Sequence, residues 1–106
     1  MPQYVIRLTH SSDQCPTANA KVRDLFIKGM PAMPQLAEKL GLKFLAGPLI
    51  LGAEHEGIAI VEADNVEAVQ DFVIQSGMVQ WNSVRVTAAM TAQQAVAELE
   101  KLTPLY

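Results

Sequence analysis

Aromatic side chains, cysteines and charged residues are all scarce in this chain. Aromatic residues make up 6% of the 106 positions and charged residues 18%, against about 25% charged in a typical soluble domain. A small domain has much surface to keep hydrated, so the low charge content predicts that another subunit covers part of it. The single cysteine excludes an internal disulfide, and a cytoplasmic location is expected.

Clustered basic residues and long apolar runs are also missing. The net charge is -3 and no stretch is rich in Lys and Arg, which argues against a nucleic-acid partner. No apolar run approaches the ~18 residues of a membrane span, and the N-terminus shows no secretory signal pattern. The length suits one domain over residues 1–106.

Hydrophobic periodicity predicts four strands and three helical regions. The strands are expected at 3–9, 43–53, 57–63 and 83–89, where residues alternate or run almost wholly apolar. The helical regions are expected at 18–40, 65–76 and 92–102. Gly29, Pro31 and Pro34 should break the first region into pieces at 18–29 and 33–40. Asp64 and Thr91 are the expected caps of the later helices, Thr91 in a capping box with Gln94.

This order of elements predicts an α+β fold of the ferredoxin-like βαββαβ kind. Right-handed crossovers favour a four-stranded antiparallel sheet in the order 4-1-3-2, with helices on one face and a C-terminal helix added. Pro48 cannot donate to a ladder, so the second strand should lie at an edge. The uncovered sheet face needs a partner, and a second copy is the simplest one.

Three segments resemble the dimeric α/β-barrel superfamily of ferredoxin-like proteins. They are similar to the central strand, second helix and last strand of its small uncharacterised members, and comprise Gly57–Asn65, Val66–Ser76 and Trp81–Thr87. The resemblance implies a homodimer in which two sheets enclose a ligand cavity. It also implies a range of activities that includes cofactor-free monooxygenases and muconolactone isomerases. Haem-binding members use a His in the second helix, and residues 65–76 contain none, so no cofactor is expected.

The segment His10–Thr17 holds one of the two histidines and the only cysteine. Cys15 precedes Pro16 at an expected helix start, where the helix dipole would favour the thiolate. His10 is the one obvious group near it that titrates around neutral pH. His10 and Cys15 are therefore the candidate catalytic residues. The plainer interpretation, which the isolated cysteine favours, is that Cys15 is a small buried hydrophobic residue.

A metal site is the alternative function for the same loop. His10 and Cys15 are both ligands of soft metals, and Asp13 could add a third. Two ligands are too few for a closed zinc site, so no metal is expected. His55 in the turn Glu54–Glu56 is expected to be solvated, at the opposite end of the sheet from His10.

Candidate ligand-binding residues lie on the strands. Arg7 and Arg85 are expected side by side on the sheet face away from the helices, where they would need an anion. Glu62 is one candidate partner, a bound carboxylate or enolate is another, and salt bridges between subunits are a third. Trp81 is expected either in a cavity wall or in the core.

The predicted function is therefore a homodimeric α/β-barrel protein that binds a small apolar or acidic organic molecule. The resemblance adds a cofactor-free monooxygenase- or isomerase-like activity to this expectation. The alternatives are a metal-binding protein that uses His10 and Cys15, and a structural module without a site.

Overall fold

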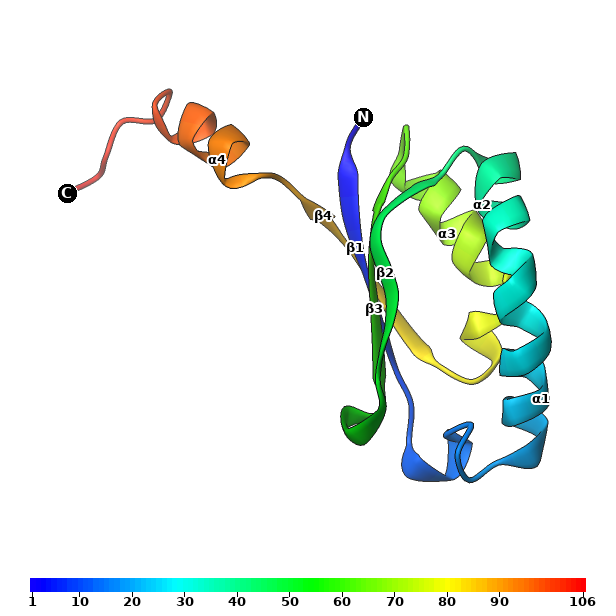
Figure 1. Cartoon of the computed structure of the whole chain (residues 1–106). Helices are drawn as coiled ribbons and strands as arrows, with labels where there is room; N and C mark the ends of the chain where they lie inside the picture. Colours follow the sequence, from blue (N-terminus) through cyan, green and yellow to red (C-terminus); the bar gives the residue numbers. More distant parts are fainter.

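The computed structural model describes all residues 1–106 and has an antiparallel four-stranded sheet with helices on one face (Figure 1). The α-helices and strands, in chain order, are β1 (Gln3–Thr9), α1 (Ala20–Gly29), α2 (Met33–Leu40), β2 (Lys43–Leu51), β3 (Glu56–Glu62), α3 (Val66–Gln75), β4 (Ser83–Ala89) and α4 (Ala92–Leu99). None of the helices is long and apolar enough to span a membrane.

The sheet order is β2-β3-β1-β4, which is the predicted order counted from the other edge. β2 lies at an edge, as Pro48 predicted, and β3 is central. Both pairings of β1 are antiparallel, with Arg7 opposite Ile58 on one side and Arg85 on the other. The α+β class and the sheet order are thus confirmed, and the dimeric barrel stays a prediction.

The core lies between the sheet and the helices α2 and α3. From the sheet it takes alternate residues such as Ile6 and Val61, and from α3 it takes Val69, Phe72 and Val73, all at most 3% exposed. The inward-facing side chains, every second residue of the strands and one side of each helix, pack together in this layer. No polar or charged residue is buried in it.

The break in the first helical region follows the prediction. α1 ends at Gly29, a 3₁₀ turn spans Met30–Ala32, and α2 follows up to a left-handed Gly41. Pro31 occupies the first turn of the 3₁₀ segment, where its missing N–H costs least.

Three local predictions are corrected. Asn65, rather than Asp64, caps α3, because its side chain accepts a hydrogen bond from the N–H of Ala68 at 3.0 Å. The hairpin turn is longer than predicted, since β2 ends at Leu51 and β3 begins at Glu56. The first helix begins at Ala20, with Asn19 as its cap.

The C-terminal helix α4 does not cover the sheet. Thr91 and Gln94 form the predicted capping box, yet α4 and the tail project away from the body of the molecule (Figure 1). Val96, Leu99 and Leu102, an apolar stripe along α4 and the turn after it, are 54%, 65% and 66% exposed. The capping sequence was sufficient to form the helix, but nothing in the single chain buries its apolar side.

Candidate functional site

The site is assembled where β1 ends and where β3 and β4 begin. Thr9, the last residue of β1, is paired with Glu56 and Ser83, the first residues of the two neighbouring strands. Continuing both ladders by one residue places His10 between His55 and Asn82. The backbone N–H of His10 donates to the carbonyl of His55 at 3.1 Å, which fixes the two residues side by side.

The prediction that the two histidines lie at opposite ends of the sheet is therefore wrong. Their ring centroids are 5.5 Å apart. Because β3 is antiparallel to β1, it starts where β1 finishes, and the hairpin before β3 must lie at that end. His55 is also only partly exposed rather than solvated. Its backbone is left-handed, with φ of 54°, a conformation that a residue other than glycine rarely adopts.

Cys15 reaches the same place from the loop after β1. It follows a short 3₁₀ turn and is 5% exposed. The first turn of α1 holds the loop in place: Arg23 donates from its guanidinium to the carbonyls of Pro16 and Thr17, both at 2.8 Å. The loop backbone is therefore anchored by one side chain of the helix that follows it, Arg23.

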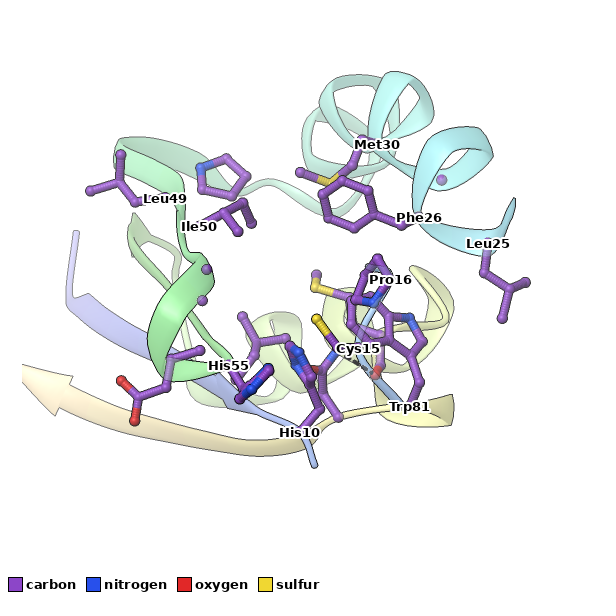
Figure 2. Close-up of a pocket in the computed structure, with 18 of the residues that line it drawn as sticks. His10, Cys15, Pro16, Leu25, Phe26, Met30, Leu49, Ile50, His55 and Trp81 are labelled. Atoms are coloured by element: carbon purple, nitrogen blue, oxygen red, sulfur yellow. Dashed lines mark hydrogen bonds between the residues drawn. The ribbon is translucent and has the colours of Figure 1, made fainter. Parts of the chain in front are cut away.

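The ligand atoms of His10, Cys15 and His55 all lie within 4.8 Å of one another. Figure 2 shows their side chains converging below α1, with Trp81 beside them. The ring of Trp81 is 5.3 Å from that of His10 and 6.1 Å from that of Phe26, centroid to centroid.

Hydrogen bonds define the proton positions on His10. The side-chain N–H of Asn82 donates to the carbonyl of Met78 at 3.2 Å, so the Asn82 oxygen is the end that faces Nδ1 of His10, at 3.1 Å. Nδ1 must then carry the proton, which leaves Nε2 with a free lone pair. That Nε2 is buried and has no hydrogen-bond partner, and the same is true of Nδ1 of His55.

Cys15 is set up to be a thiolate. Hydrogen bonds from the side chain and the backbone of Thr17 contribute most to lowering the pKa of its thiol from 9.0 to about 6, against the opposing effect of burial. The Thr17 hydroxyl lies 3.0 Å from the sulfur. The predicted cause, a helix N-terminus, is wrong, because α1 starts five residues later. Thr17, which supplies this hydroxyl, was not predicted from the sequence as a functional residue.

The three groups line one end of a pocket of about 240 Å³. Its remaining walls are mainly apolar side chains of the α1 region, β2 and the loop before β4, including Phe26, Met30, Leu49, Ile50, Met78 and Trp81 (Figure 2). An apolar pocket with a few converging polar groups is the usual form of a small-molecule site.

The pocket unites three of the predicted site residues, His10, Cys15 and Trp81, and adds His55. The pairing of strands was the signal that could have found His55, since the predicted sheet order already placed both histidines at one end.

The predicted arginines lie elsewhere. Arg7 and Arg85 are directly opposite each other on the sheet face away from the helices, as predicted, and neither lines the pocket. Arg7 is paired with Glu56 at 3.7 Å, not with Glu62. Glu62 lies opposite Gln3, about 13 Å along the strand from the position of Arg7. The ligand-binding role of Arg7, Arg85 and Glu62 stays a prediction for the open face.

Comparison with models of protein families finds no match, and comparison with curated proteins finds no significant relative.

Proposed function

We propose that this protein binds a small, mainly apolar organic molecule in the pocket above His10, Cys15 and His55, and that it works as a homodimer. The observation that carries the proposal is the pocket itself: an apolar chamber of about 240 Å³ with its polar groups gathered at one end. The apolar walls of such a pocket favour binding of the ligand, and the polar groups fix the ligand's orientation.

The size of the pocket limits the ligand. An apolar protein cavity of about 150 Å³ is enough to hold benzene, and this pocket is larger. Its walls suit a ligand built around one ring or a short branched chain. A polar or acidic group on that ligand would face the imidazoles, which are the donors and acceptors at that end.

Trp81 provides a direct test, because it is the only tryptophan and lines the pocket. Titration with phenol or benzoate should change its fluorescence with saturation at one ligand per chain. Ile50→Glu should weaken this binding about ten-fold or more, since it places a charge in the apolar wall.

Ile74→Glu is the matched control, because Ile74 is similarly exposed, at 60% against 57%, but lies outside the pocket. Equal losses in both variants, or no saturable response to any small ring compound, would contradict the proposal.

The homodimer is supported by apolar surface that the single chain leaves uncovered. Only 14 of the 106 residues are buried, which is a small core for a stable lone domain. Val5 and Ile60, paired at the centre of the open sheet face, are only partly buried. The stripe of α4 is exposed as well. A second copy offers matching apolar surface to both.

Sedimentation velocity at micromolar concentration tests the dimer. We expect a dimer for the natural chain and dissociation for Val5→Asp or Leu99→Asp, which put a charge into the proposed interface. Ala97→Asp, on the opposite side of α4, should leave the dimer intact. If the natural chain sediments as a monomer, the homodimer is refuted, while the proposal that the pocket binds a ligand is unaffected.

The proposal also includes membership of the dimeric α/β-barrel superfamily and a cytoplasmic location. Two open sheet faces packed together would form the barrel of the dimeric α/β-barrel superfamily, and the βαββαβ order supports that assignment. A cytoplasmic location suits a free thiol with a low pKa, which a reducing compartment protects from oxidation. The monooxygenase- or isomerase-like activity implied by the resemblance stays a prediction.

A further inference from the structure

We propose that His10, Cys15 and His55 together bind a late first-row transition-metal ion, Zn²⁺ or a copper ion, through two imidazoles and one thiolate. The three residues come from three separate segments: the end of β1, the loop before α1 and the hairpin before β3. The inference is independent of the proposed ligand binding, since the pocket could hold a molecule with or without the ion.

The distances fit an ion. At a tetrahedral zinc with bonds of about 2.0–2.3 Å, neighbouring ligand atoms lie about 3.3–3.6 Å apart. The ligand atoms of the three residues already lie within 4.8 Å of one another. The remaining difference of about 1 Å is of the size that side-chain rotations cover.

The two unpartnered nitrogens are the second, independent observation. Nε2 of His10 and Nδ1 of His55 are buried without a hydrogen-bond partner. A buried polar atom normally has a partner, so each exception needs an explanation. For His10 the explanation is specific: Asn82 holds the proton on Nδ1 and leaves the lone pair of Nε2 free. This is how a metal-binding histidine is usually oriented by its outer partner.

The third ligand is prepared in the same way. The hydroxyl of Thr17 approaches the sulfur of Cys15 at 3.0 Å, which favours the thiolate that a metal requires. His55 holds the left-handed conformation that puts its ring at the cluster. Strained backbone at a cluster of this kind is typical of functional sites.

The ligand set indicates which ions would bind. Imidazole and thiolate favour zinc and copper over magnesium or calcium, which prefer oxygen. Three protein ligands leave one position open, as in catalytic rather than structural zinc sites. That position would face the pocket, where water or a donor atom of a bound molecule could complete the coordination.

Cobalt(II) is the probe for the test, because its spectrum reports both thiolate coordination and geometry. Protein freed of metal by dialysis against a chelator should bind one Co²⁺ per chain, with a sulfur-to-cobalt charge-transfer band and the intense visible bands of a four-coordinate site. Zn²⁺ should displace the cobalt and should protect Cys15 from iodoacetamide.

Two variants assign the ligands. Cys15→Ser should abolish the charge-transfer band. His55→Asn should weaken Co²⁺ binding at least ~100-fold, since a lost ligand should cost no less than the 10–100-fold of a lost outer partner. Asn tolerates the left-handed backbone at this position, so the variant should keep the fold, which circular dichroism would check. Glu54→Gln, in the same turn but outside the cluster, is the matched control and should bind normally.

The proposal is overturned if the natural chain gives no charge-transfer band with excess Co²⁺ while Cys15 is reactive toward iodoacetamide. Cys15 and the two histidines would then be neighbouring polar groups that bind no metal ion. It is also overturned if His55→Asn binds Co²⁺ as tightly as the natural chain. Neither result bears on the binding of phenol or benzoate, which Trp81 reports separately.

Discussion

The helix-covered face of the sheet has a solid half and a hollow half. At one half, α3 lies on the sheet and buries three of its ten residues, and Phe44 packs against Phe72 with ring centroids 5.6 Å apart. At the other half, α1 also has ten residues but buries only Val22, and the space between it and the sheet is the pocket. One layer of the same fold therefore serves both as core and as candidate site.

The difference arises from how each helix is attached. α3 follows β3 directly and leaves through a tight left-handed turn at Gly77, so its apolar stripe rests on the strands. A ten-residue loop, residues 10–19, separates β1 from α1, and that loop inserts Cys15 between helix and sheet. With this longer connection, the inner side of α1 faces the pocket instead of resting on the strands.

The strongest contrast between the halves should come from two phenylalanines. Phe72→Ala in the solid half should lower the free energy of unfolding by about 3–5 kcal/mol, because it opens a cavity in a closed core. Phe26→Ala at the pocket wall should cost only ~1 kcal/mol, since Phe26 is partly exposed already. Urea unfolding measures both, and equal losses would mean that the hollow half is as tightly packed as the solid one.

A smaller effect is expected from a glycine in β2, next to the pocket-lining Pro48. Gly47 in β2 has φ of 78°, and a Cβ there would lie 2.6 Å from the carbonyl oxygen of Ile58. Gly47→Ala should therefore destabilise the protein by about 2 kcal/mol or more, because the clash is with backbone and the conformation is left-handed.

Gly29 at the end of α1 is the matched control. A Cβ there meets nothing within 4 Å, so Gly29→Ala should leave stability unchanged or raise it by up to ~1 kcal/mol. If Gly29→Ala lowers the free energy of unfolding, α1 is as closely packed as α3, and the two halves do not differ as described.

The smallest change in stability, below ~1 kcal/mol at or below pH 6, is expected for Thr17→Val, because Thr17 is exposed and valine has nearly the same volume. Its effect should be chemical instead. In metal-free protein, alkylation of Cys15 should show a midpoint near pH 6, and Thr17→Val should move that midpoint up towards 9.0 because the hydroxyl donor is lost. Ser11→Ala, at the outer side of the same loop, should leave it unchanged.

The pH dependence of stability follows from the same group. A thiol whose pKa is lower in the folded chain stabilises the fold as the thiolate, so its contribution is complete above pH 9 and is lost as the pH falls through 6. The stability advantage of the natural chain over Thr17→Val should grow from pH 6 to 9. A constant difference over that range would mean that Cys15 is only a packed hydrophobic residue.

Much of the fold could be predicted because it depends on local chemistry. The alternation in residues 3–9, the break at Gly29 and Pro31, the edge position of Pro48 and the capping box of Thr91 each follow from the residues themselves. The predicted start of a helix differs from the observed one where either of two neighbouring side chains could cap it, as with Asp64 and Asn65.

The sequence by itself determined the strands, their order and the presence of His10 and Cys15 in one loop, because periodicity, breakers and crossover rules act over short distances. Only the tertiary structure decided that His55 joins them, that Thr17 donates to the sulfur of Cys15 and that α1 stands off the sheet. His10 and His55 are 45 positions apart, and Phe26 and Trp81, which both line the pocket, are 55 apart. Side-chain directions across such a contact are set by the packed chain, and no local pattern encodes them.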